Sequence, residues 1–220
     1  MKEDKNMSLN QAYLEQLSQH NDHSVEALRA YAVANQVPIV HRLTLEMIKQ
    51  LIRIHQPKRI LEIGTAIGYS AMQFASIDKE IAVFTMERDD AMIAEAKKNI
   101  SAYHFDDQVH LFEGDALHLC DEVTPHGPFD MIFIDAAKAQ SQKFFEMYTP
   151  YLKEGGLVIT DNVLYHDFVA DISTVRRRNL RQMVQKIQQY NAWLMAHPDY
   201  TTNYLNIDDG LAISIKGESK

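Results

Sequence analysis

Apolar positions follow two patterns along the chain, and the change between them marks its organisation. Up to about residue 56 they recur with helical spacing. This spacing predicts two short helices within Ser8–Asn35, broken near Asn21 and Asp22, and a third over Leu43–Ile52 that Pro57 terminates. We therefore expect residues 1–56 to form a helical extension.

From residue 57 onward, short apolar runs alternate with longer amphipathic segments, as is typical of a parallel sheet covered by helices. The predicted strands are Arg59–Ile63, Ala82–Met86, Val109–Phe112, Met131–Ile134 and Leu157–Thr160, and the predicted helices are Ser70–Ser76, Asp90–Ala102, Ser141–Leu152 and Leu180–Ala196. Two further strands, Tyr200–Ile207 and Leu211–Lys216, flank an Asp-Asp-Gly turn typical of an antiparallel hairpin. The expected fold is α/β, with a mostly parallel seven-stranded sheet over residues 57–220.

Composition fits one domain over residues 1–220. The chain is 46% hydrophobic, yet no apolar run approaches the roughly 18 residues of a membrane span. Its start, residues 1–10, is polar rather than signal-like, and Cys120 is the lone cysteine, which excludes an intramolecular disulfide. We expect a cytoplasmic protein without a membrane partner.

The net charge of −8 argues against nucleic-acid binding driven by an overall positive field. A local basic cluster is nevertheless present, formed by Arg176, Arg177, Arg178, Arg181 and Lys186. Two interpretations of it are open at this point: a solvated helix face, or a confined surface for a polyanion.

The segment Ile60–Ser70 combines a strand, a glycine turn and a helix start, an arrangement typical of nucleotide sites. Gly64 and Gly68 allow a sharp bend and a close approach of the backbone to a ligand, which then faces helix N–H groups. Dinucleotide sites require a second glycine where this chain has Ala66, and Glu62 stands just before the turn.

Two more strand ends carry acids that suit a nucleoside. Glu87 lies a little over 20 residues beyond the glycine turn, where a carboxylate accepts hydrogen bonds from ribose hydroxyls. Gly114, Asp115 and Ala116 follow the third strand, where a loop would contact adenine. Each acid has the alternative of being a surface charge, but ligands bind at these carboxyl ends of strands.

The last two parallel strands end in Asp135 and in Asp161-Asn162. Neighbouring parallel strands bring such ends together, so two carboxylates and an amide would offer hard oxygen ligands to Mg²⁺ or another hard divalent cation. Coincidence, or an Asn that caps the next segment, is the alternative. Lys138 would lie over the same pocket as a general base, unless it is a solvated lysine at a helix start.

These motifs together resemble the metal-dependent class I O-methyltransferases, which include the catechol and caffeoyl-CoA enzymes. The likeness runs from about Val37 to Lys216 through LEIGxxxGYS, Gly114-Asp115-Ala116, DAAK and DNV. It implies a Rossmann-like fold and S-adenosylmethionine as cofactor, contacted by Val40, Glu62, Gly64, Ser70, Glu87, Ala116 and Asp135. It also implies metal ligation by Asp135, Asp161 and Asn162 and catalysis by Lys138.

Ala137 and Gln140 differ from the residues of the catechol and caffeoyl-CoA enzymes, which argues against both of these substrate classes. Catechol enzymes have a Trp where this chain has Ala137, and caffeoyl-CoA enzymes have Asp and Asn at the two positions. The chain is more similar to the bacterial tRNA 5-hydroxyuridine methyltransferases, through ILEIGTAIGYS, FIDAAK, DNVL, the arginine stretch, YNxWLMxHPDY and DGLAIS. This resemblance implies methylation at the tRNA wobble position, with Arg176, Arg177, Arg178 and Arg181 holding the anticodon loop.

Two other functions remain open. A methyltransferase of a small phenol or catechol would share the same catalytic residues, whereas a nicotinamide oxidoreductase would leave Asp135, Asp161 and Asn162 without a role. Tyr190 and Trp193 have helical spacing on an apolar face, so we expect them to pack in the core. Family likeness implies a homodimer, and the N-terminal helices would form either its interface or a lid over the cofactor.

Overall fold

The sheet of the computed structural model contains seven strands in the order β3-β2-β1-β4-β5-β7-β6. The structure describes residues 9–18 and 24–217. The strands are β1 (Arg59–Ile63), β2 (Ala82–Glu87), β3 (Val109–Glu113), β4 (Phe129–Ile134), β5 (Leu152–Asp161), β6 (Tyr200–Leu205) and β7 (Leu211–Lys216). Strands β1 to β5 pair in parallel, and β7 pairs antiparallel with both β5 and β6. The mixed Rossmann-like sheet and its closing hairpin confirm the predicted fold class.

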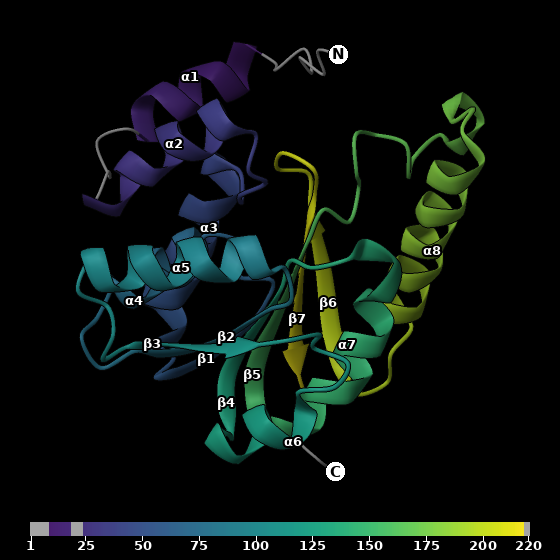
Figure 1. Cartoon of the computed structure of the whole chain (residues 1–220). Helices are drawn as coiled ribbons and strands as arrows, with labels where there is room; N and C mark the ends of the chain where they lie inside the picture. Colours follow the sequence, from purple (N-terminus) through teal and green to yellow (C-terminus); the bar gives the residue numbers. More distant parts are fainter. Residues whose placement is uncertain (1–8, 19–23, 218–220) are drawn as a thin grey trace.

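Helices cover both faces of this sheet (Figure 1). They are α1 (Leu9–Ser18), α2 (Ala27–Asn35), α3 (Arg42–His55), α4 (Tyr69–Ala75), α5 (Asp90–Ala102), α6 (Cys120–Val123), α7 (Ser141–Tyr148) and α8 (Arg178–Met195), with short 3-10 turns between several of them. None of the helices in the described ranges is both long enough and apolar enough to cross a bilayer.

Alternating side chains of the central strands pack into two separate hydrophobic cores, one on each face of the sheet. Met131 and Phe133 of β4 pack with α2, α3, α4 and α5, whereas Ile132 and Ile134 pack with α6, α7 and α8. This alternation follows from the period-2 geometry of a strand buried on both faces. Buried residues of α2 and α3, among them Leu28 and Ile48, belong to the first core, so these two helices are packed onto the sheet.

The predicted helices and strands differ from the observed ones mainly around residue 150. The helix expected over Ser141–Leu152 ends at Tyr148, because Pro150 has no N–H to continue the α-helical hydrogen bonds, and the chain continues as a 3-10 turn over Thr149–Tyr151. Leu152 instead begins β5, which is longer than expected at its amino end. The short α6 was not predicted, and the expected break at Asn21 and Asp22 lies outside the described residues, as does Ser8.

Candidate functional site

The strand order reverses between β1 and β4, and the predicted site residues gather at the carboxyl ends of these and the adjacent strands. Gly64, which follows β1, has φ +105°, and a Cβ atom there would clash with the carbonyl oxygen of Asp135. The Asp135 N–H donates to the Ile63 carbonyl over 3.0 Å. Glycine therefore allows the cofactor turn and the end of β4 to touch.

A cavity of about 840 Å³ opens at this point. Nearly all of the predicted cofactor, metal and base residues line it, namely Val40, Gly64, Ser70, Glu87, Gly114, Asp115, Ala116, Asp135, Lys138, Asp161 and Asn162. Its volume is in the range of small-molecule and cofactor pockets. One cavity therefore brings together residues spread over more than half of the sequence.

Glu62 lies behind this cavity and is fully buried. The Thr85 hydroxyl donates to its Oε2 over 2.6 Å, while its Oε1 has no hydrogen-bond partner of good geometry among the described residues. Burial raises the pKa of Glu62 to about 7, and the nearby hydroxyls of Ser70 and Thr85 oppose this shift. A buried carboxylate oxygen without a donor is costly and favours a ligand that supplies one.

Glu87 organises the cofactor turn in addition to lining the cavity. Its Oε2 accepts from the Ala66 N–H over 2.9 Å, and its Oε1 accepts from the N–H groups of Arg88 (2.9 Å) and Asp89 (3.0 Å). A carboxylate oxygen has two lone pairs, so Oε2 can still accept from one ribose hydroxyl. Sequence reasoning missed this structural role, because it depends on how the turn after β1 folds back toward β2.

The loop after β3 is supported from below by Tyr148. Gly114 has φ +145° and donates its N–H to the Glu87 carbonyl over 2.7 Å. The buried Tyr148 hydroxyl donates to the carbonyl oxygen of Ala116 over 2.5 Å, and Asp115 accepts from the Leu117 N–H. Tyr148 was not predicted, since its position in α7 resembles any other core residue of an amphipathic helix.

Asp135 and Asp161 lie at the ends of two hydrogen-bonded parallel strands, one residue beyond the pair Ile134 and Thr160. The Asn162 amide nitrogen is 3.3 Å from Asp135 Oδ1, and the Asn162 N–H donates to Asp161 Oδ1 over 2.7 Å. The predicted cluster is therefore assembled. Asn162 has φ +64°, a left-handed conformation that asparagine tolerates better than most residues.

The two acids carry strongly shifted pKa values. Burial raises the pKa of Asp135 to about 6, against the opposing effect of Lys138 and His41. Burial and the charge of Asp135 raise the pKa of Asp161 well above its usual range. Within residues 9–18 and 24–217, no three His, Cys, Asp or Glu side chains are grouped to hold a metal ion, because the third predicted ligand is an amide.

Lys138 begins a 3-10 turn after β4, and its Nζ lies 5.9 Å from the ring centre of Tyr165. Tyr165 follows Asn162 by three residues, in a loop where Tyr165, His166 and Asp167 all have positive φ. An aromatic ring is thus close to the candidate base, although the residue before Lys138 is alanine. The tyrosine directly after DNVL is the one indication of this ring that the sequence offers.

The hairpin turn 208–210 holds this loop in place through hydrogen bonds. The Asp209 carbonyl accepts from the N–H groups of Leu164 and Tyr165, and its carboxylate accepts from the His166 N–H over 3.1 Å. Asp208 accepts from the N–H and hydroxyl of Thr44, near the start of α3. One turn therefore connects the loop of residues 162–167, the acid loop, with the start of α3.

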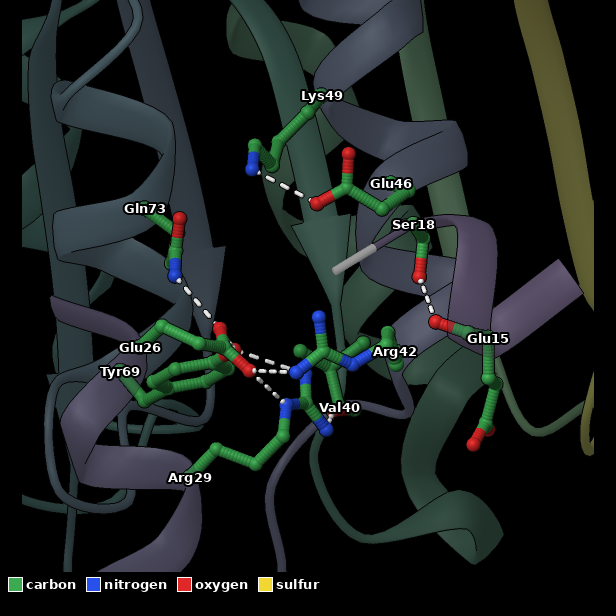
Figure 2. A network of polar contacts seen from close by, with 10 residues as sticks. All are labelled: Glu15, Ser18, Glu26, Arg29, Val40, Arg42, Glu46, Lys49, Tyr69 and Gln73. Carbon is green, nitrogen blue, oxygen red and sulfur yellow. Dashed lines mark hydrogen bonds and ion pairs between the residues drawn. The ribbon is translucent and has the colours of Figure 1, made fainter. Parts of the chain in front are cut away.

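The N-terminal helices supply a wall of the cavity that sequence reasoning left undefined. Arg29 and Val33 of α2 and the segment 37–41 line the cavity. Arg29 belongs to a polar network centred on Glu26 (Figure 2), in which Arg29, Arg42, Tyr69 and Gln73 all donate to one carboxylate. His41, also on this wall, was not predicted, since a lone histidine after Val40 has no distinctive pattern.

The basic cluster lies outside the cavity. Arg176, Arg177, Arg178 and Arg181 are exposed around the start of α8, and within the described part of the chain none of the four forms an ion pair with an acidic residue. Helix α8 has no acidic residue in its first turn and no side-chain cap. Its start lies at the same end of the molecule as the β6–β7 turn (Figure 1). Tyr190 is buried and stacks on Trp193, as predicted for core residues.

Comparisons with known proteins place this arrangement in context. Residues 11–217 match the family model of the O-methyltransferases. A catechol O-methyltransferase from Niastella koreensis is 31% identical over 77% of this chain and 78% of its own length. A Staphylococcus aureus protein named after the caffeoyl-CoA O-methyltransferases has a crystal structure with a TM-score of 0.93 and 63% identity, covering 96% of this chain and all of that one. The Bacillus cereus O-methyltransferase in complex with SAH has a TM-score of 0.80 at 25% identity, over 93% of this chain and 97% of that one.

Proposed function

Since the chain belongs to the O-methyltransferase family, we propose that it methylates the 5-oxygen of 5-hydroxyuridine at the tRNA wobble position, with S-adenosylmethionine as methyl donor. The family match supports O-methyl transfer as the reaction. The observation that supports RNA as the substrate is the exposed arginine cluster at the start of α8. The sequence motifs shared with tRNA 5-hydroxyuridine methyltransferases support the same substrate.

The cavity matches the chemical groups of S-adenosylmethionine. The orphaned Glu62 Oε1 suits the ammonium group, and Glu87 suits the ribose hydroxyls. The loop Gly114–Ala116 would border the adenine, with Val40 and Ser70 on the methionine side. The SAH-bound relative from Bacillus cereus has the same fold, which supports this assignment.

Asp135, Asp161 and Asn162 would hold Mg²⁺ or another hard divalent cation. Burial raises the pKa of both carboxylates, and the charge of Asp135 raises that of Asp161 further, so a cation would stabilise the ionised pair. With the Asn162 amide oxygen, the two carboxylates are the hard donors that such ions prefer. When bound, the cation would favour the ionised form of a substrate hydroxyl and fix its position. The donor set therefore fits the ion, provided that the Asn162 amide turns its oxygen to the position where its nitrogen now faces Asp135.

Lys138 would take the proton of the substrate hydroxyl. It lines the same cavity as Asp135 and Asp161, within reach of a group held there. The substrate oxygen forms a bond to the methyl carbon while the carbon–sulfur bond breaks, leaving S-adenosylhomocysteine. Apart from proton transfer, the protein mainly aligns oxygen, carbon and sulfur in line.

The arginines at the start of α8 are unfavourable for the helix itself. Cations near a helix N-terminus oppose the helix dipole, and α8 has neither an acid in its first turn nor a side-chain cap to compensate. A phosphate group would pair with the arginines and accept from the free N–H groups of the first turn. RNA binding explains this composition, whereas a solvated helix face does not.

A catechol-type small molecule is the second candidate substrate. The Niastella koreensis relative carries that activity in its name, and the Tyr165 ring near Lys138 offers a flat surface to a phenol as well as to a pyrimidine. Ring stacking alone does not separate the two. The arginine cluster favours tRNA, because a neutral phenol gains nothing from it.

The decisive experiment compares two acceptors under one condition. Purified protein, S-adenosylmethionine and Mg²⁺ are incubated with catechol, or with tRNA that carries 5-hydroxyuridine, and methyl transfer is measured. We expect transfer to tRNA at a kcat/KM far above that for catechol. Robust transfer to catechol with none to tRNA would overturn the tRNA proposal and leave O-methyl transfer intact.

A further inference from the structure

The carboxylate of Glu26 accepts hydrogen bonds from four side chains next to the N-terminal wall of the cavity (Figure 2). Glu26 Oε1 accepts from Arg29 Nε over 2.6 Å and from Arg42 Nη2 over 2.5 Å. Its Oε2 accepts from the Tyr69 hydroxyl over 2.5 Å and from the Gln73 amide over 3.2 Å. These donors come from α2, α3 and α4, so one side chain joins three helices.

The cluster of Glu26, Arg29 and Arg42 is nearly closed to solvent. The side chains of Glu26, Arg29 and Arg42 are 13%, 17% and 14% exposed. Desolvating one carboxylate and two guanidinium groups costs free energy that their mutual attraction only partly offsets. Such a cluster is a poor source of stability but a good means of fixing geometry.

The network reaches the cavity through Arg29. Its Nη2 donates to the Tyr69 hydroxyl over 2.8 Å, its Nη1 lies 3.4 Å from the Val40 carbonyl, and its guanidinium lies 5.0 Å from the centre of the Tyr69 ring. Arg29, Val40 and Tyr69 all line the cavity. Tyr69 is also the first residue of α4, directly after the Gly68 turn. The network therefore ties the segment around Val40 to the helix start that faces the cofactor.

We infer that Glu26 is a positioning residue for cofactor binding: through Arg29 and Tyr69 it holds the wall formed by residues 37–41 against α4, at the methionine end of S-adenosylmethionine. Glu26 itself does not line the cavity. Its effect is to fix the backbone of Val40 before the cofactor arrives, which lowers the ordering cost of binding. This inference rests on the proposed function, because it takes the cavity to be the S-adenosylmethionine site.

The test is Glu26→Gln, with Glu46→Gln as a matched control. Glu46 is a similarly buried acid, 17% exposed, that pairs with Lys49 on α3 and does not line the cavity. Calorimetric titration with S-adenosylhomocysteine should show a Kd about tenfold higher for Glu26→Gln and within about twofold of wild type for Glu46→Gln. At saturating cofactor, kcat of Glu26→Gln should stay within about twofold of wild type, whereas the KM for S-adenosylmethionine rises.

Equal Kd values for wild type and Glu26→Gln, or equal increases in both variants, would overturn the inference, since the second result reports general loosening of the helices. If Glu26→Gln does not fold, Tyr69→Phe removes the hydrogen bonds of the Tyr69 hydroxyl with Glu26 and Arg29 while these two residues stay paired with each other. It should raise the Kd about threefold, and an unchanged Kd would refute the positioning role. Failure of the wild type to bind S-adenosylhomocysteine would instead refute the proposed cofactor.

Discussion

At the scale of single residues, the acids of the cavity lie where a cation would stabilise them. Burial raises the pKa values of Glu62, Asp135 and Asp161, and nearby acids add to the rise at Glu62 and Asp161, so ionisation of each costs free energy in the folded protein. A nearby cation reverses that cost. The proposed ligands are an ammonium group at Glu62 and a divalent ion between Asp135 and Asp161. Each would stabilise the ionised form of the acids that it contacts.

The acid pair predicts a pH-dependent effect of Mg²⁺ on stability. Protons compete with the ion for carboxylates whose folded-state pKa is raised, so Mg²⁺ affinity should fall as pH falls through about 6. Mg²⁺ should therefore raise the melting temperature more at about pH 8 than at about pH 5.5, by several degrees at saturation. Scanning calorimetry with and without the ion measures this difference.

Asp161→Asn should abolish the Mg²⁺ effect, whereas Asp115→Asn, a partly exposed acid of the same cavity, should preserve it. Excess chelator should stop methyl transfer without weakening S-adenosylhomocysteine binding. Full activity in chelator would rule out the metal site.

Glu62 predicts release of a proton when the cofactor binds. Its raised pKa means that the folded, ligand-free protein holds a proton between about pH 4.5 and 7 that the unfolded chain has lost, so its contribution to stability falls as pH rises through this window. An ammonium beside Glu62 lowers that pKa. Titration with S-adenosylhomocysteine at about pH 6, in two buffers of different ionisation enthalpy, should show net proton release that Glu62→Gln removes. Release unchanged by Glu62→Gln would assign it to another group.

Individual site residues could be predicted where their role follows from a strand end. Gly64, Asp135 and Asp161 come directly after apolar runs, and parallel strands bring such ends together. The second role of Glu87, as acceptor for three N–H groups, depends on turn geometry that no periodicity encodes. The approach of Tyr165 to Lys138 depends likewise on left-handed backbone in a loop.

At the scale of elements, the turn 208–210 shapes the site through its contacts with the acid loop. Gly210 has φ +87°, and a Cβ there would overlap the Leu164 side chain and lie 2.8 Å from the Leu164 nitrogen. The second contact is with backbone, so a side-chain rotation does not relieve it. The conformation of the acid loop therefore depends on the absence of a side chain at this position.

Gly210→Ala should destabilise the protein and weaken Mg²⁺ binding, and Gly155→Ala separates the two causes. Gly155 has φ +72° and no atom within 4 Å of the point where a Cβ would lie, so alanine there adds conformational strain alone, about 1–2 kcal/mol. The clash at Gly210 should lower the free energy of unfolding by at least about 2 kcal/mol more than the strain alone does. Denaturant titration measures both, and equal losses in the two variants would contradict the packing argument.

The elements themselves were largely predictable, because strands buried on both faces form short apolar runs. The error at Ser141–Leu152 has a local cause: the amphipathic pattern continues through Tyr151, while Pro150 and pairing of Leu152 with Phe129 end the helix earlier. The contribution of α2 to the cavity wall was not predictable, since it depends on the Glu26 network between separate helices.

At the scale of the whole molecule, a net charge of −8 opposes approach of a polyanion, so RNA binding must depend on a confined surface. Arg176→Ala with Arg178→Ala should raise the apparent KM for tRNA and reduce the slope of log KM against log salt by up to about 1.4, the counterions of two single-strand phosphates. Methyl transfer measured at two salt concentrations gives this slope.

The matched control is Arg53→Ala with Lys79→Ala, two exposed cations near the amino ends of β1 and β2, at the opposite end of the sheet. It removes the same charge and should leave the slope unchanged. Equal slopes for both double variants would show that only total charge matters and would contradict a dedicated RNA surface.

The place of β7 between β5 and β6 has a consequence for assembly of the fold. β6 precedes β7 in the chain but pairs only with it, so β5 stays an unpaired edge until the hairpin has formed and docked. Its buried residues Leu157 to Asp161 then present open N–H and C=O groups, which is the condition for strand addition between molecules. A hairpin from a second copy fits that edge as well as its own does. Exchange of β6 and β7 between copies is thus the misfolding route that this topology leaves open.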